Sequence, residues 1–409
     1  MSDLNWLRGQ DLNLRPSGYE PDELPDCSTP RWAKDHNATR AVRVPFSKGD
    51  PVSDDVDTFV ARAPKVHLHC HLEGSLQAAT FLELVERDGL STRYRPGEGA
   101  GEQAAGPTDP AEVYRFADFR EFLLTFAAVS RALRTPDDYA RLAREFVADA
   151  LAQNVVYGEL FISPSVWRFF HPELDLRDAV AAVAQELRAA RAHGAAFALI
   201  ADVTRNFGVK SAGQTMQLAA TLGDLDVIGI GLGGDEARFP AELFADVFAQ
   251  ARALGLHTVA HAGEAAGAHS VRAAVEILGA ERIGHGVRAI EDSAVVELLC
   301  ERRIPLEICP TSNALTGAVE RDAEHPLAEL DRQGAHITID ADDPTLFETS
   351  ISREYAMVAR SLGVPALRRF IAQAVDATFL ADADKHALRE RVRTELGPVR
   401  EKLEQNVRT

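Results

Sequence analysis

The stretch PKVHLHCHLEGSL, residues 64–76, decides the fold. Its first part, 65–70, is an apolar run that we interpret as the first β-strand, and histidine recurs there at every second position. Because successive side chains of a strand point to opposite faces, His67, His69 and His71 share one face. Two neighbouring histidines on one face can bind a metal ion together, although a solvated or hydrogen-bonded histidine cluster has the same pattern.

Short apolar runs alternate with helical patterns along the rest of the chain, which is typical of a parallel sheet wrapped by helices. We expect eight strands, at 65–70, 155–162, 197–203, 226–231, 257–261, 281–285, 304–309 and 336–340. Eight parallel strands separated by helices predict an α/β fold, the (β/α)8 TIM barrel, with reacting groups at the C-terminal ends of the strands. The last 45 or so residues are expected to form extra helices outside the barrel.

Several helices are visible as apolar positions spaced by three and four. We expect one over 240–255, with Pro240 at its first position and Gly255 after its end. Another helical pattern carries four large apolar residues, Phe119, Phe122, Leu123 and Phe126. A lid over a binding site could have this spacing, but we expect these four side chains to pack in the core.

The chain divides into one domain and two terminal segments. Residues 1–60 are rich in proline and lack sustained apolar periodicity, so we interpret them as a mobile extension or as the product of a start site placed too far upstream. Residues 61–400 are expected to form a single catalytic domain, and 401–409 a short tail.

Composition argues against some partners. The 409 residues include 62 Asp and Glu against 44 Lys and Arg, a formal charge of −18 that would repel polyanions such as nucleic acid and anionic membrane. No apolar run approaches the roughly 20 residues that span a bilayer, and the N-terminus lacks the pattern of a signal peptide. We therefore expect a cytoplasmic protein with a small-molecule substrate, and the sequence leaves its oligomeric state open.

Metal-compatible side chains also end the fifth and eighth predicted strands. His261 occurs in VAHAGE, and Asp342 and Asp343 occur in IDADDP. Taken alone, the histidine suits a hydrogen-bonded core and the two carboxylates suit a loop cap. At one barrel mouth, however, three imidazoles and a carboxylate make a mixed nitrogen and oxygen site suited to Zn²⁺ with room for water. We expect one zinc ion per chain.

Two further residues near the strand ends suit proton transfer at such a site. Glu264 follows His261 by three residues and can protonate the ring nitrogen beside an attacked carbon. His285, between two glycines in IGHGV, can hydrogen-bond a metal-bound water and steady the developing charge, although a turn histidine is the alternative. The Gly-rich run 229–236 lacks the Lys-Ser/Thr of a phosphate loop and more plausibly offers a backbone amide to a flat heterocycle.

Taken together, a series of short motifs resembles the adenosine deaminase family in that family's order. They are PKVHLHCHLEGSL, YRFADFREFLLTF, VVYGELFISP, GIGLGGDE, HAGE, RIGHGVR, EICPTSN and DADDP, within about 64–400. The resemblance implies a hydrolase in which a zinc-activated hydroxide attacks purine C6. Adenosine and 2′-deoxyadenosine would lose their 6-amino group as ammonia, and adenosine would give inosine.

The resemblance also implies a role for each matching position. The zinc ligands would be His69, His71, His261 and Asp342. Glu264 would donate a proton to purine N1, and His285 would orient the hydroxide. Substrate would be contacted by Glu73 at the sugar, by Asp343 accepting a hydrogen bond at N7, and by the amide of Gly234 at N3.

Three positions depart from the commonest adenosine-specific pattern. Glu73 replaces an Asp that contacts the ribose 5′-hydroxyl, and relatives that act on free adenine also carry Glu there. Phe161 replaces an Arg, and Gly231 replaces an Asp. Because the segment GGDE resembles the nucleoside enzymes more closely, we predict adenosine as substrate, with adenine or another 6-aminopurine derivative as the alternative.

Two rival functions use the same barrel. A two-metal amidohydrolase normally needs a bridging carboxylated lysine at the end of the fourth strand, and residues 229–232 contain no lysine. A catalytically silent purine-binding barrel is the non-enzymatic alternative, but every catalytic position of the family is filled. The sequence therefore favours a single-metal deaminase.

Overall fold

The computed structural model describes residues 54–96, 106–320 and 323–397. Eight strands form one parallel sheet in the order β1 to β8. Their bounds are β1 Lys65–His71, β2 Val155–Ile162, β3 Ala196–Thr204, β4 Val227–Gly233, β5 His257–Ala262, β6 Arg282–His285, β7 Pro305–Ile308 and β8 His336–Ile339. Every predicted strand is confirmed, and the sequence order of the strands is also their order in the sheet.

Hydrogen bonds just beyond β8 bring that edge of the sheet onto β1. The amide of His71 donates to the carbonyl of Asp342 at 2.9 Å, and the amide of Asp342 donates to the carbonyl of His69 at 3.0 Å. Asp340 Oδ1 also accepts from the amide of Leu68 at 2.6 Å. The predicted TIM barrel is thus confirmed, and its closure holds Asp342 beside two histidines of β1.

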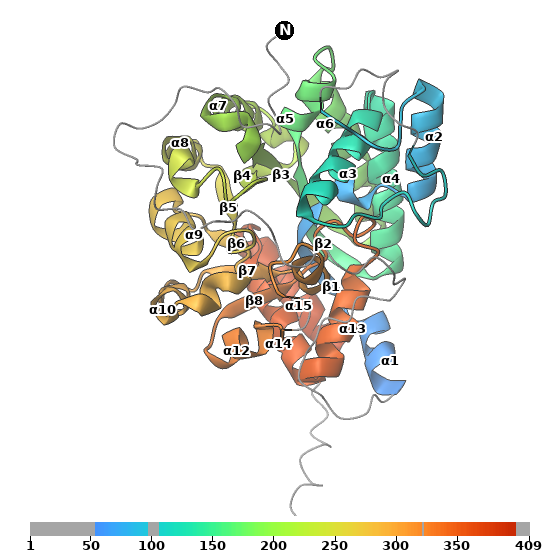
Figure 1. Cartoon of the computed structure of the whole chain (residues 1–409). Coiled ribbons are helices and arrows are strands. Elements are labelled where there is room, and N and C mark those ends of the chain that lie inside the picture. Colours follow the sequence, from blue (N-terminus) through green and yellow to red (C-terminus); the bar gives the residue numbers. More distant parts are fainter. Residues whose placement is uncertain (1–53, 97–105, 321–322, 398–409) are drawn as a thin grey trace, which may run out of the picture.

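Helices surround the strands on the outside (Figure 1). The α-helices are α1 Asp54–Arg62, α2 Ala78–Asp88, α3 Phe119–Ala132, α4 Pro136–Ala152, α5 Pro164–Phe170, α6 Leu176–Ala189, α7 Gly208–Ala219, α8 Ala245–Ala253, α9 Ala268–Ala273, α10 Ser293–Arg302, α11 Pro310–Leu315, α12 Leu327–Arg332, α13 Ile351–Leu362, α14 Val364–Ala377 and α15 Asp382–Leu396. Shorter helical turns are η2 Glu73–Ser75, η3 Ala190–His193, η4 Arg205–Phe207, η5 Gly223–Leu225, η6 Ala241–Phe244, η7 Ala274–Leu278 and η8 Val287–Glu291.

The helix expected over 240–255 is shorter and divided. Pro240 has an extended backbone, with ψ at 155°, so it precedes the helical residues instead of starting them. A 3-10 turn, η6, follows it, and the α-helix α8 ends at Ala253. Gly255 does adopt the left-handed conformation expected after a helix end, with φ at 79°.

The N-terminal boundary of the domain lies earlier than expected. Helix α1 begins at residue 54, inside the predicted 1–60 extension, and buries Val56 and Val60. The buried Lys65 ammonium donates to the carbonyl of Val60 at 2.7 Å, which attaches α1 to the start of β1. The remainder of the predicted extension and the 401–409 tail lie outside the described residues.

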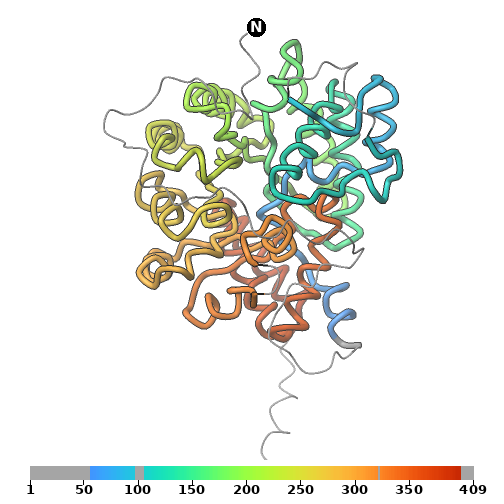
Figure 2. The backbone as a smooth tube through the Cα atoms, viewed as in Figure 1, coloured from blue at the N-terminus to red at the C-terminus, as the bar shows by residue number. Residues whose placement is uncertain are grey.

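The helices after β8 confirm the expected extra layer. Figure 2 shows the orange-red helix α13 beside the blue N-terminal helix α1, and the two helices pack against each other. Helix α14 packs against β8 and β1, the two strands at which the barrel closes. The C-terminal helices therefore cover the seam of the barrel.

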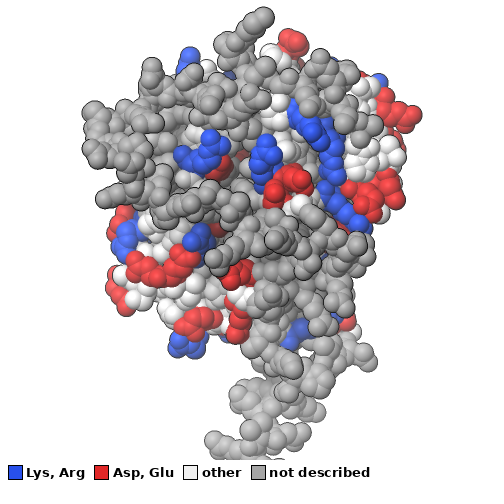
Figure 3. All heavy atoms as spheres, viewed as in Figure 1, with Lys and Arg blue, Asp and Glu red and all other residues white. Residues whose placement is uncertain are grey.

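The described surface carries charge of both signs. On the face drawn in Figure 3, acidic and basic side chains are interspersed. None of the helices within the described ranges combines the length and the apolar character needed to cross a membrane.

Candidate active site

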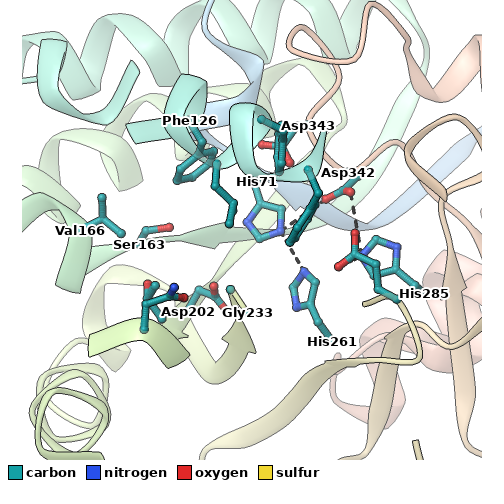
Figure 4. A pocket seen from close by; sticks show the side chains of 17 residues that line it. His71, Phe126, Ser163, Val166, Asp202, Gly233, His261, His285, Asp342 and Asp343 are labelled. Carbon is teal, nitrogen blue, oxygen red and sulfur yellow. Dashed lines mark hydrogen bonds and ion pairs between the residues drawn. The ribbon is translucent and has the colours of Figure 1, made fainter. Parts of the chain in front are cut away.

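A cavity opens among the C-terminal ends of the strands and contains most of the residues singled out from the sequence (Figure 4). The predicted residues that line it are His71, His261, Glu264, His285, Asp342, Asp343 and Gly234. His69 is completely buried next to them. The structure therefore brings together side chains that are separated by up to 274 residues in the chain.

Three histidines and one carboxylate meet at a common point. The Nε2 atoms of His71 and His261 are 3.1 Å apart. Asp342 Oδ1 lies 3.4 Å from Nε2 of His69 and 3.4 Å from Nε2 of His71. His285 belongs to the same cluster, with Nε2 4.0 Å from Asp342 Oδ2. These are spacings at which ligands of a single metal ion stand.

The outer nitrogens of two of these imidazoles are held by hydrogen-bond acceptors. His69 Nδ1 lies 2.8 Å from Glu307 Oε2, and His261 Nδ1 lies 3.2 Å from the carbonyl of Leu232. A carboxylate or a carbonyl oxygen can only accept a hydrogen bond, so each Nδ1 carries the hydrogen when its ring is neutral. The Nε2 lone pairs of His69 and His261 then face the common point, as metal ligands require.

The donor set fits a zinc ion. His69 Nε2 is buried and makes no hydrogen bond to the described residues, and two imidazole nitrogens face each other at 3.1 Å. Burial opposes a charge on His69, yet the carboxylates of Asp342 and Glu307, one beside each ring nitrogen, raise its pKa well above the usual value. The environment therefore favours a positive charge at this point, and three nitrogens with one oxygen suit Zn²⁺.

A buried ionic chain supports His69 from inside the barrel. Glu307 Oε1 lies 2.5 Å from Arg282 Nε, and Arg282 Nη1 lies 2.5 Å from Glu159 Oε2. Burial opposes ionisation of Glu307, but the charge of Arg282 and the hydrogen bond with His69 lower its pKa overall. Glu307 therefore remains a carboxylate that orients His69. Sequence reasoning assigned no role to these three residues, although Glu307 stands in the quoted motif EICPTSN.

We predict that replacing Glu307 with Gln weakens zinc binding about 10- to 100-fold, the usual effect of losing the partner of a metal-binding histidine. The amide removes a negative charge and leaves Arg282 with one carboxylate instead of two. Competition with a chromophoric chelator measures the affinity. The control is Glu301→Gln, the same change at an exposed position of α10. Equal zinc affinity in both variants would contradict the supporting role of Glu307.

Glu264 is held in place by another glutamate that follows β4. Glu236 Oε2 accepts from the amides of Glu264, at 3.1 Å, and of Ala265, at 2.7 Å. Burial and the negative charges of Asp342 and Glu236 raise the pKa of Glu264 to about 8. Its carboxyl Oε2 lies 3.6 Å from His285 Nε2. The backbone of Glu264 is thus fixed at the edge of the cavity, and the raised pKa of its carboxyl favours the protonated form.

Two residues of the site have backbones in the left-handed region. His285 has φ at 59° and Asp342 has φ at 62°, values that are uncommon for residues other than glycine and that cluster at functional sites.

Gly74 makes room for the carboxyl of Asp343, because a Cβ at Gly74 would lie 1.9 Å from Asp343 Oδ1. Burial and the charge of Asp342 raise the pKa of Asp343 well above its usual value.

Glu73, the predicted sugar contact, is hydrogen-bonded to the wall of the cavity. Its side chain is fully buried, and Oε1 accepts from the amide of Ser163 at 2.8 Å and from Trp167 Nε1 at 2.7 Å. Ser163 lines the cavity, whereas Glu73 is not among the lining residues. Glu73 therefore supports the wall of the cavity from behind.

The aromatic residues of α3 form one side of the cavity. Phe119, Phe122, Leu123 and Phe126 all line it. As predicted, they also pack with the hydrophobic core. The structure adds that the same side chains face the cavity. The ring of Phe126 lies edge-on to His71, with centroids 6.2 Å apart. An apolar wall of this kind suits a flat, largely apolar ring.

Asp202, at the end of β3, is a cavity residue that sequence reasoning missed. It lies with Gly233 and Ser163 on the side of the cavity away from His285 (Figure 4). Its Oδ1 atom is buried and has no hydrogen-bond partner among the described residues. Burial and then the charge of Glu73 raise its pKa to about 8. The only sequence signal was its position at a strand end.

Comparison with known proteins shows the family of the chain. The family model described as adenosine deaminase matches residues 64–395, nearly the whole barrel. The chain belongs to the adenosine deaminase family. Members of this family are hydrolytic deaminases of the metal-dependent amidohydrolase superfamily, as the resemblance of the motifs implied.

Relatives within the adenosine deaminase family differ in their substrates. The chain is 35% identical to an aminodeoxyfutalosine deaminase of Streptomyces coelicolor, over 84% of this chain and 88% of the relative. It is 32% identical to an adenine deaminase of Vibrio parahaemolyticus, over 82% and 97%. A zinc-bound amidohydrolase structure from Burkhoderia ambifaria superposes with a TM-score of 0.74 at 28% identity, covering 86% and 95%.

Proposed function

We propose that this protein is a zinc-dependent deaminase that hydrolyses the 6-amino group of a small 6-aminopurine, with adenine as the substrate and hypoxanthine and ammonia as products. The convergence of His69, His71, His261 and Asp342 beside the carboxyl of Glu264 carries this proposal. The zinc-bound relative and the purine deaminases in the family support it. Adenosine, our prediction from the sequence, becomes the second candidate.

The residues present suit the reaction. His69, His71, His261 and Asp342 would hold Zn²⁺, which lowers the pKa of water so that hydroxide forms near neutral pH. Glu264, protonated in its buried position, would protonate purine N1 while C6 gains an oxygen. His285 would direct an N–H toward that oxygen. The bond between C6 and the exocyclic nitrogen then breaks, and this nitrogen leaves as ammonia with one proton of the consumed water, while the other proton restores the carboxyl of Glu264.

The remaining contacts fix the plane of the purine. The amide of Gly234 would donate to N3, and Asp343 would bind at N7 on the opposite edge. For adenine with its proton on N9, N7 offers only a lone pair, so Asp343 would have to donate there; the sequence-based expectation of an accepted hydrogen bond would be reversed. The raised pKa of Asp343 supports its protonated form.

Adenine is favoured over adenosine by the place of Glu73. The family contact to the ribose 5′-hydroxyl comes from this position, yet Glu73 lies behind Ser163 and Trp167 and outside the cavity lining. To test the proposal, the rate of deamination is measured on adenine, on adenosine and on N6-methyl-AMP by the change in ultraviolet absorbance. The zinc content of the protein is determined in parallel. Adenine should have the highest kcat/KM. A preference of tenfold or more for adenosine would restore the second candidate.

We predict that replacing Asp202 with Ala lowers kcat/KM for adenine about 10-fold or more without lowering the melting temperature. In the proposed orientation, the carboxyl of Asp202 faces the N9 edge of adenine and accepts a hydrogen bond from N9–H, so its loss weakens binding. In the free protein, its buried oxygen without a hydrogen-bond partner destabilises the fold, so its removal should not lower the melting temperature. The measurement compares adenine with 9-methyladenine, which lacks that proton. The control is Asp235→Asn, because Asp235 is not a cavity-lining residue and its Oδ1 accepts from the amide of Arg238. An unchanged preference between the two substrates would contradict this contact.

A further inference from the structure

A chain of hydrogen bonds behind His285 determines which of its ring nitrogens carries the proton. It begins at the amide of Leu327, the first residue of α12, which donates to His325 Nδ1 at 3.1 Å. An amide at the start of a helix has no partner within the helix, so it is free to donate to a side chain. Since His325 Nδ1 accepts this hydrogen bond, it has no proton of its own.

The donor-to-acceptor direction of the hydrogen bonds continues from His325 to Asn313. Burial lowers the pKa of His325 to about 3, so its ring is neutral and must carry its single proton on Nε2. His325 Nε2 lies 3.3 Å from Asn313 Oδ1, the acceptor atom of the amide. With its oxygen engaged in this way, Asn313 presents its NH2 group on the other side.

Asn313 then determines which ring nitrogen of His285 carries the proton. Its Nδ2 atom lies 3.0 Å from His285 Nδ1, so it donates there and His285 Nδ1 must be unprotonated. A neutral His285 consequently carries its proton on Nε2, the nitrogen 3.6 Å from Glu264 Oε2 and 4.0 Å from Asp342 Oδ2. All three side chains of the chain are buried, so water does not compete for these positions.

This arrangement is the reverse of the one at the metal-binding histidines. His69 and His261 donate from Nδ1 to acceptors and present a lone pair at Nε2. His285 accepts at Nδ1 and presents an N–H. A nitrogen that carries hydrogen cannot bind a metal, although the side chain is close enough to belong to the same cluster.

We propose that Asn313 and His325 are positioning residues that hold the proton of His285 on Nε2, which keeps His285 out of the metal coordination and makes it a hydrogen-bond donor to the reacting oxygen. The position of the proton follows from the hydrogen bonds alone; its use in the reaction rests on the proposed function. The two parts can therefore be tested separately.

Nitrogen NMR on the zinc-loaded protein with ¹⁵N-labelled histidine tests the position of the proton. The His285 signals are identified by their loss in His285→Gln. We expect an unprotonated shift for Nδ1 and a protonated shift for Nε2. In Asn313→Asp, a carboxylate replaces the donor with an acceptor of the same shape, so the proton should move to Nδ1. A proton on Nδ1 of His285 in the unsubstituted protein would overturn the proposal, whatever the enzyme's substrate.

Kinetics test the use of the proton. Asn313→Asp should lower kcat about 100-fold on the best purine substrate, with KM changed less than about threefold, because the lost donor acts on the reacting oxygen. The matched control, Asn154→Asp, makes the same change at the opposite end of the barrel, at the residue before β2. His325→Gln keeps an N–H donor for Asn313 and should retain most of the turnover. An unchanged kcat in Asn313→Asp would overturn the functional role while the NMR result stood.

Discussion

Replacing Glu264 with Gln should lower kcat on adenine about 1000-fold while leaving one zinc ion per chain. Glutamine has nearly the same shape and keeps the hydrogen bonds of its backbone amide to Glu236, but it has no acidic proton for purine N1. The loss falls on kcat because protonation of N1 accompanies attack at C6. Stopped absorbance assays and zinc analysis of the purified variant measure both quantities.

Glu242→Gln provides the comparison for this variant. Glu242 is an exposed residue of η6 outside the cavity lining, so the same Glu-to-Gln change there does not alter the site. Turnover of Glu264→Gln within tenfold of this control would exclude Glu264 as the proton donor. A loss of zinc together with activity would instead assign Glu264 a structural part in the metal site.

Replacing His261 with Ala should weaken zinc binding more than 100-fold and abolish turnover. His261 Nε2 faces His71 at the common point, and its Nδ1 is hydrogen-bonded to the carbonyl of Leu232, so alanine would remove an oriented ligand. Metal analysis after dialysis against a weak chelator measures retention. The thermal shift on adding zinc, which stabilises only a protein that binds it, gives a second and independent readout.

His285→Ala is the informative comparison for the metal site. His285 has comparable burial and also lies within the cluster, but its Nε2 proton would prevent coordination. We therefore expect His285→Ala to retain zinc and lose turnover, whereas His261→Ala loses both. Stoichiometric zinc in His261→Ala would show that the ligand set is wrong, and loss of zinc in His285→Ala would place His285 in it.

Local sequence patterns were sufficient for the fold and for most of the site. Short apolar runs between helical patterns located every strand, because a strand buried on both faces of the sheet is apolar at nearly every position. The histidine alternation in β1 placed His69 and His71 on one face. Since parallel strands must end at the same edge, His261, Glu264 and Asp342 could be assigned to one cavity from their positions alone.

Other features depend on which side chains the closed barrel brings together. Glu159, Arg282 and Glu307 stand on three different strands, and nothing local in the sequence indicates that they form one buried ionic chain behind His69. The same holds for Asp202, whose role as a cavity residue depends on the glycines of β4 beside it.

The sequence by itself determined the strand order, and it indicated the cluster of possible metal ligands and the proposed proton donor, because each is encoded in a short motif at a strand end. Only the tertiary structure decided which residues line the cavity, as it placed the phenylalanines of α3 there and Glu73 behind its wall. It also decided the hydrogen-bond direction at His285. That direction is inherited from the Leu327 amide through His325 and Asn313, and a proton's position depends on such contacts in space.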